Sequence, residues 1–211
     1  MLFSPVAPPR TVQYVPGHNR WHPEIPPVAE VIAGGSVRLN CQGGDVLCGP
    51  VGVVGAEPGD LVMIEVLGIG RVDGSYAGTG HPGILGCAPS LAMLRHAGAD
   101  PAGALLGRIA PASADHARVA ARAEPIRAAC RALAPRAQIL FPVHVLGARI
   151  SAGDLHFLDE GGCETGDGWL DLRVHLTKRG MERFGVTEPV LMPITTSSLD
   201  ATVAGLTVGV A

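Results

Sequence analysis

The segment Leu170-Asp-Leu-Arg-Val-His-Leu176 decides the fold class, because apolar and polar residues alternate along its whole length. Side chains of a β-strand point alternately to opposite faces, so this pattern predicts a strand with one buried face. The residues of that buried face are Leu170, Leu172, Val174 and Leu176.

A residue pattern typical of β-strands extends upstream of this segment. It fills residues 28–72, where the turn signals are Gly34-Gly35, Gly43-Gly44 and Pro58-Gly59-Asp60. It returns over Gln138-Ile-Leu-Phe-Pro-Val-His-Val-Leu146. We expect His144, inside that apolar run, to be a core histidine with satisfied hydrogen bonds rather than a ligand.

Helical signals are fewer. Short helices are predicted from Ser90 to His96 and over residues 177–184, where Gly185 ends the second. Residues 113–134 are rich in Ala and Arg and predict a helix interrupted at Pro125. Residues 73–89 predict a Gly-rich loop.

The composition agrees with a folded, β-rich chain. Of 211 residues, 47% are apolar and only 17% charged, which argues against disorder. The 29 Gly and 18 Pro residues argue against a helical bundle. We therefore expect one mainly β domain over residues 1–211, with a Pro-rich N-terminal arm over residues 1–27.

Charge and cysteine usage exclude several function classes. A net charge of −3 leaves no basic surface for phosphate contacts, so no nucleic acid is expected as a partner. No apolar run approaches the roughly 18 residues that span a bilayer, and no signal peptide is visible, so no membrane is expected either. Five cysteines without a Cys-x-x-Cys pair indicate reduced thiols. We expect a cytoplasmic protein.

The most suggestive polar motif is Gly153-Asp-Leu-His-Phe157. On a strand, Asp154 and His156 would point to the same side while Leu155 faces the core. A carboxylate and an imidazole on one face can bind a metal jointly, or act as a base with the group that orients it. The alternative is a hydrogen-bonded surface pair with no chemical role.

A second polar cluster is His18-Asn-Arg-Trp-His22. Proline residues on both sides make a helix unfavourable, so we expect a loop that presents His18, Arg20 and His22 to a cleft. The alternative is an exposed polar loop held by Trp21. His81 carries a weaker signal, as the first residue of a His-Pro-Gly turn.

Other candidate nucleophiles have weaker support. The chain contains no Gly-x-Ser-x-Gly elbow, dinucleotide loop or P-loop. Ser90 is expected to cap a helix or form a turn. Cys163 shows no base partner in the sequence, so we expect an inert thiol.

Several stretches, in order along the chain, resemble the acetamidase/formamidase family of amide hydrolases. They are His18–Val31, Gly49-Pro50, Gly55–Val62, His81–Ser90, Phe141–Ala148, Gly153–Phe157, Trp169–Leu176 and Arg179–Val190. The formamidase branch is the closer likeness, chiefly through the last of them.

The resemblance implies a function and a site. It implies sandwich- or barrel-like β-sheets with minor α/β elements, and hydrolysis of formamide or acetamide to a carboxylate and ammonia. It also implies a homo-oligomer that takes a small amide as its substrate. The implied catalytic residues are Asp154, His156, His18 and His22. The implied substrate-binding residues are Arg20, His81 and Glu160, with Glu164 as the alternative acidic position. Asp154 and His156 are the implied ligands of a divalent metal, Zn or Ca.

The chain also departs from the family's pattern. The links at 42–48 and 70–80 are shorter than the family's, and residues 124–135 lack its Asn-Gly-Gly-Asn segment. Two alternatives therefore stay open. One is a shortened homologue that keeps the scaffold without catalysis, and the other is a metal-binding protein without amidase activity.

Overall fold

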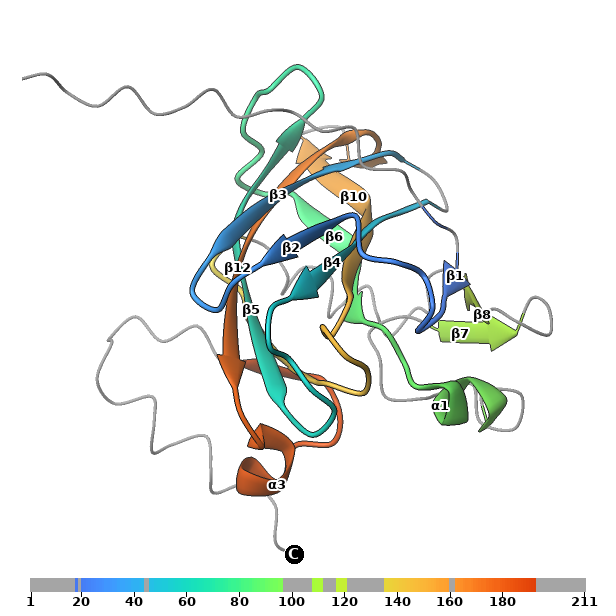
Figure 1. The fold of residues 1–211 in the computed structure, drawn as a ribbon. Coiled ribbons are helices and arrows are strands. Elements are labelled where there is room, and N and C mark those ends of the chain that lie inside the picture. The colour runs from blue at the N-terminus through green and yellow to red at the C-terminus, as the bar shows by residue number, and fades with distance from the viewer. Residues whose placement is uncertain are drawn as a thin grey trace, which may run out of the picture.

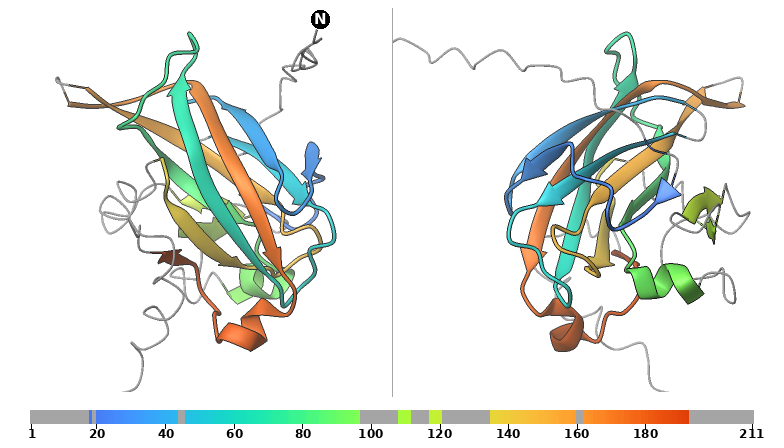
Figure 2. Two further views of the ribbon diagram at one scale, coloured as in Figure 1. Left: turned by 90° about the vertical axis from the view of Figure 1, so that its left-hand side faces the viewer. Right: turned by 45° about the vertical axis from the view of Figure 1, so that its right-hand side comes forward.

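The computed structural model describes residues 18, 20–43, 46–96, 108–111, 117–120, 135–159 and 162–192. Two curled five-stranded β-sheets face each other around one apolar core, as Figure 1 and Figure 2 show. The fold is mainly β and sandwich- to barrel-like, so the predicted fold class is confirmed.

Strands make up most of the described elements, and the helices are short. In chain order the elements are β1 (Arg20–Trp21), β2 (Ala29–Val31), β3 (Ser36–Cys41), β4 (Leu47–Val53), β5 (Leu61–Arg71), β6 (His81–Cys87), α1 (Leu91–His96), β7 (Arg108–Pro111), β8 (Ala117–Ala120), β9 (Gln138–Pro142), β10 (Ile150–Asp159), β11 (Gly162–Thr165), β12 (Gly168–Thr177), α3 (Gly180–Phe184) and β13 (Val190–Met192). Within the described residues, α1 and α3 are each far too short to cross a membrane.

Three sheets arise from these strands. Sheet 1 has the order β11-β10-β4-β2, with β6 also paired to β10. Sheet 2 has the order β13-β9-β5-β12-β3, and sheet 3 is the small set β1-β8-β7. All pairings among them are antiparallel except that of β2 with β4.

The alternating segment that predicted the fold is the centre of sheet 2. It forms β12, which pairs with β5 on one side and β3 on the other. Leu170, Leu172 and Val174 are fully buried, and Leu176 packs against the core from a partly buried position. The predicted buried face is therefore confirmed.

Two expectations about local structure are wrong. Residues 81–87, expected within a loop, form β6, whose seven residues are all buried. A strand covered on both faces shows no alternation, and its Gly and Pro residues suggested a loop. Residues 117–120, expected to be helical, form β8, because they pair with both β7 and β1. Tertiary pairing overrides the helix preference of Ala there.

Both short helices are confirmed. The Ser90 hydroxyl accepts a hydrogen bond from the Met93 N–H at 3.2 Å, so Ser90 caps α1 as expected. The second helix, α3, is followed by Gly185 in the left-handed conformation at φ 65°, which ends it.

A buried carboxylate ties α3 to the start of β5. Asp60 accepts hydrogen bonds from the N–H groups of Glu57 and Arg179, each at 2.8 Å, and from Lys178 Nζ at 2.7 Å. Burial alone would raise the pKa of Asp60. The hydrogen bonds from Lys178, Arg179 and Glu57 outweigh that effect and lower the pKa. Ionised Asp60 therefore stabilises the fold.

We predict that replacing Asp60 with Asn weakens the acid dependence of stability. Because the folded-state pKa is lowered, the stabilisation is present above the ordinary aspartate pKa of about 4 and is lost as the pH falls through the folded-state value. Urea unfolding midpoints should fall more steeply below about pH 4 in the wild type than in Asp60→Asn. Parallel pH profiles for the two proteins would contradict this role for Asp60.

Candidate functional site

The polar motif identified in the sequence lies on β10, a strand that changes its partner half-way along. On one edge, β6 pairs with β10 from Ile150 to His156. On the other edge, β4 pairs with it up to Gly153, and β11 takes over at His156. Asp154 and Leu155 therefore lie where the second partner changes.

Asp154 has a left-handed backbone conformation, with φ 52°. Before it, Ile150 and Ala152 belong to the core, and after it Leu155 and Phe157 do. The core-facing positions of the strand thus change from even to odd residue numbers at this point, while its pairing with β6 keeps one register from Ile150 to His156. Asp tolerates this conformation better than most residues, because its short polar side chain can hydrogen-bond locally.

The sheet leaves room for the Asp154 side chain at Gly83 on the neighbouring β6. A Cβ atom at Gly83 would lie 2.7 Å from the Asp154 carbonyl oxygen and 2.9 Å from its Cγ, and closer still to Oδ2. Real Cβ atoms do not approach other atoms so closely, so only glycine fits at this position. Gly83 therefore fixes the position of the carboxylate, whose side chain is 2% exposed.

Asp154 and His156 point to the same side of β10, as predicted. His156 Nε2 lies 3.0 Å from Asp154 Oδ2. An ionised carboxylate only accepts hydrogen bonds, so Nε2 carries the proton and donates it. In the neutral imidazole, the other ring nitrogen, Nδ1, is then an acceptor. The imidazole is thereby fixed in one tautomer and one orientation.

The acceptor nitrogen of His156 faces a thiol. His156 Nδ1 lies 3.2 Å from Cys163 Sγ, so the expectation that Cys163 has no base partner is wrong. Cys163 is on β11, the return strand of a hairpin in which His156 is paired with Thr165 and Leu158 with Cys163. Cys163 is the diagonal neighbour of His156, close enough for side-chain contact.

The sequence held a signal for this contact. The Gly161-Gly162 dipeptide just after the Asp-x-His strand is typical of a hairpin, and a hairpin there returns the chain beside His156.

His81 supports the same group from β6. Its ring stacks on that of His156, with centroids 5.0 Å apart and an interplanar angle of 13°. His81 is 5% exposed, and its Nδ1 lies 3.3 Å from the carbonyl oxygen of Pro82. Expected in a turn, His81 is in fact the first residue of a strand, paired with His156.

The segment His18–His22, expected as a loop, contains the two-residue strand β1 and contacts β10 at a different place. His18 Nε2 lies 2.9 Å from the Ser151 hydroxyl, three residues ahead of Asp154. His22 is 6% exposed, and its Nδ1 accepts a hydrogen bond from the Glu24 N–H. A position of His18 or His22 within about 10 Å of His156, as expected for groups that share one pocket, stays a prediction.

Of the remaining expected site residues, only Glu164 has a described side chain. Arg20 is placed in β1 by its backbone, and Glu160 lies outside the described residues. Glu164 is exposed on β11, where its carboxylate lies 3.6 Å from Arg71. Their roles stay predictions.

The expected metal ligands do not form a metal-binding group in the part of the chain that is described. No three His, Cys, Asp or Glu side chains converge there in a way that could hold an ion. Asp154 and His156 bind each other, and the second nitrogen of His156 faces Cys163.

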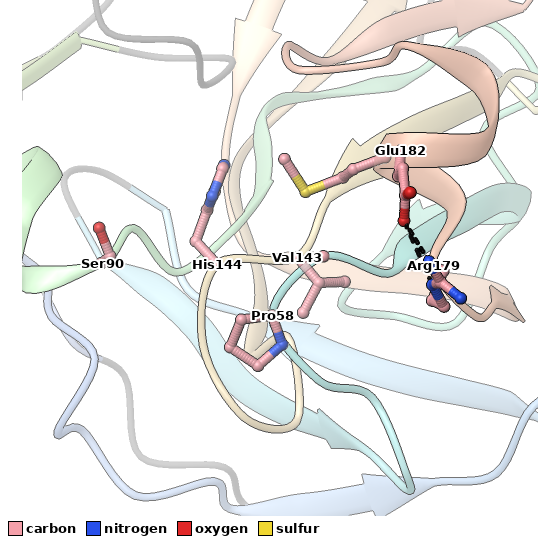
Figure 3. A pocket seen from close by; sticks show the side chains of 8 residues that line it. Pro58, Ser90, Val143, His144, Arg179 and Glu182 are labelled. Carbon is pink, nitrogen blue, oxygen red and sulfur yellow. Dashed lines mark hydrogen bonds and ion pairs between the residues drawn. The ribbon is translucent and has the colours of Figure 1, made fainter.

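A separate pocket of about 490 Å³ lies between the turn before β5, the segment after β9 and α3 (Figure 3). It is lined by Pro58, Gly59, Ser90, Val143, His144, Arg179, Met181 and Glu182. Burial lowers the pKa of His144, so its ring is neutral near pH 7. Its buried Nε2 has no hydrogen-bond partner among the described residues, which corrects the expectation of a satisfied core histidine. None of the Asp154, His156 and Cys163 side chains lines this pocket.

Comparison with known proteins identifies the family of this chain. The profile of the Acetamidase/Formamidase family matches residues 72–209, which include β6, β10, β11 and β12. The chain belongs to this family. It is 28% identical to a formamidase of Methylophilus methylotrophus, over 83% of this chain and 68% of that protein. It is 29% identical to an acetamidase of Mycolicibacterium smegmatis, over 86% of this chain and 71% of that protein.

Solved structures share the fold. A gamma lactamase from Delftia acidovorans superposes with a TM-score of 0.62 at 26% identity, covering 86% of this chain and 69% of that one. An acetamidase/formamidase from the thermophile Thermoanaerobacter tengcongensis superposes with a TM-score of 0.52 at 18% identity, covering 83% and 70%.

The chain is shortened inside the matching region. Its alignment with the M. methylotrophus formamidase extends over 275 residues, more than the 211 that this chain contains. The relative must therefore hold insertions between shared segments, which agrees with the short links noted in the sequence.

We predict that replacing Gly83 with Ala displaces the Asp154 carboxylate and breaks its hydrogen bond to His156. The His156 side-chain nitrogen shifts, followed by NMR, should then lose the Nε2-protonated pattern, and the thermal midpoint should fall. Gly166→Ala is the matched control, because a Cβ atom there meets nothing within 4 Å. If Gly83→Ala behaves like Gly166→Ala, the close packing of Gly83 against Asp154 is not what holds the carboxylate.

Proposed function

We propose that this protein hydrolyses the C–N bond of small amides, releasing ammonia. The observation that carries the proposal is the hydrogen-bonded pair of buried Asp154 and partly exposed His156, in a chain whose relatives include a formamidase and an acetamidase. Amide hydrolysis requires a group that takes a proton from the nucleophile and returns one to the leaving nitrogen. A neutral imidazole with one unprotonated nitrogen can accept the first proton and then donate it to the leaving nitrogen.

The roles follow from the geometry. Asp154 holds the ring through Nε2–H, and it stabilises the imidazolium that forms when Nδ1 takes up a proton. His81 stacks on the ring and limits its rotation. We assign His18, His22 and Arg20 to the wall that contacts substrate, with Glu160 as an acidic contact. His18 supports this assignment by bonding to Ser151 on the same strand.

The substrate class is a short amide, with formamide and acetamide as first choices. The likeness to a gamma lactamase adds a cyclic amide as a second candidate, which the same bond cleavage would open. The alternative of an inactive homologue is not favoured, because the acid–base pair remains assembled despite the shortened loops.

We also propose a cytoplasmic homo-oligomer. Cys41, Cys48, Cys87 and Cys163 are free thiols, the state that a reducing compartment maintains. The terminal strand of sheet 2 is β13, where Val190 and Leu191 expose apolar side chains that a second copy of the chain would cover. Light scattering on the purified chain measures the assembly, and a monomeric mass at working concentration would contradict it.

We predict that His156→Ala lowers ammonia release from formamide or acetamide by roughly 10²–10⁴-fold, the usual contribution of general acid–base catalysis. The thermal midpoint should move by only a few degrees, because His156 is partly exposed and contributes little packing. Ammonia is measured by a coupled assay with Zn, Ca or Mn supplied.

The matched control is Leu172→Ala, which should have the opposite effects. It empties a fully buried position at a cost of about 2–5 kcal/mol of unfolding free energy, while folded molecules keep their activity. A wild type that neither releases ammonia from formamide, acetamide or propionamide nor opens a γ-lactam to its amino acid would contradict the proposed function.

A further inference from the structure

We propose that Cys163 is the nucleophile of this site and that hydrolysis proceeds through an acyl-thioester on its sulfur. The inference rests on the proposed amide hydrolysis and adds the group that attacks the carbonyl carbon. Its basis is one continuous chain of contacts across the β10–β11 hairpin, from Cys163 Sγ to His156 Nδ1 and from His156 Nε2 to Asp154 Oδ2.

The order of groups in this chain is that of a nucleophile, a base and a group that orients the base. The two contacts measure 3.2 Å and 3.0 Å, both compatible with hydrogen bonds in the resting state. Asp154 is acceptor-only when ionised, so it fixes the proton on Nε2 and leaves Nδ1 to accept the thiol proton. The direction of proton transfer is thereby set by the buried carboxylate.

Access distinguishes Cys163 from the other described cysteines. Cys41, Cys48 and Cys87 are buried, whereas Cys163 is exposed on the terminal strand of sheet 1. Burial raises the pKa of Cys87 well above its ordinary value, which keeps that thiol protonated and inert. Of these four cysteines, Cys163 alone is both open to a small substrate and in contact with a base.

The reaction balances with these groups and water. The sulfur of Cys163 attacks the amide carbon as its proton passes to His156 Nδ1, giving a tetrahedral intermediate. His156 then returns that proton to the amide nitrogen, and the C–N bond breaks. Ammonia departs, and the acyl group remains on Cys163 as a thioester. Water then attacks the thioester carbon and gives one proton to His156. The C–S bond breaks, the carboxylic acid departs, and the proton returns to the sulfur.

The first test compares Cys163→Ala with the wild type and with the control Gly166→Ala. Gly166 lies just after β11 with open space around its Cα, so its replacement should leave activity unchanged. We expect Cys163→Ala to lower ammonia release from acetamide at least 100-fold with an unchanged thermal midpoint, since its side chain is exposed. Equal rates in Cys163→Ala and the wild type would overturn the inference while leaving amide hydrolysis intact.

The second test looks for the intermediate. With acetamide and hydroxylamine, an acyl-thioester should partition to acetohydroxamate, and acid-quenched wild type should carry an acetyl group that maps to Cys163. Cys163→Ala should give neither product. Hydroxamate formed equally by Cys163→Ala would show that the acyl group is carried elsewhere, and the inference would fail.

The third test does not depend on turnover. Iodoacetamide should alkylate Cys163 faster than the buried cysteines in the wild type, and His156→Ala should slow that reaction at least tenfold, because the base that accepts the thiol proton is gone. Peptide mapping identifies the labelled cysteine. Equal alkylation rates at Cys163 in the two proteins would show that His156 does not activate the thiol, even if the wild type hydrolyses no amide.

Discussion

The left-handed conformation of Asp154, in the middle of β10, is the constraint on which the site depends. It occurs where β10 leaves β4 and takes up β11, and the core-facing positions of the strand change there from even to odd residue numbers. The core therefore receives Ile150 and Ala152 before this point and Leu155 and Phe157 after it. Ser151, Asp154 and His156 are left on the opposite face, where Asp154 meets His156 and His18 meets Ser151.

The site also requires that the chain return alongside β10 as β11. The change of partner lets a short hairpin pair with the last residues of β10, and this hairpin brings Cys163 diagonally to His156. On the opposite edge of β10, Gly83 of β6 lacks a side chain and so leaves space for the Asp154 carboxylate. A rigid two-sheet core thus supports a polar group made almost entirely from adjacent strands. Sites built on strands hold their side chains more firmly than sites built on long loops. The chain can therefore lack loops that its relatives carry without losing the contacts of this group.

Sequence reasoning predicted the Asp154–His156 pair, because two residues separated by one share a face of a strand wherever that strand lies. It also predicted the buried face of β12, since alternation survives in a strand with one polar face. The Gly161-Gly162 dipeptide indicates a hairpin after the Asp-x-His strand, but spacing alone does not specify the register that brings Cys163 to His156. Sequence reasoning missed β6 because a strand buried on both faces loses its alternation, and its glycines suggested a loop. The change of core-facing positions at Asp154 was also not predictable, because Asp154 and His156 share a face of the strand with or without it.

The backbone at position 154 needs a positive φ. The direct test is the free energy of unfolding of Asp154→Gly compared with Asp154→Ala, since both variants lack the carboxylate and differ only in backbone preference. We predict that the Gly variant is more stable by about 1 kcal/mol, because a left-handed conformation strains Ala and not Gly. In an ordinary strand, Gly is less stable than Ala by roughly 0.5–1 kcal/mol. An Ala variant that equals or exceeds the Gly variant in stability would show that position 154 does not need a positive φ.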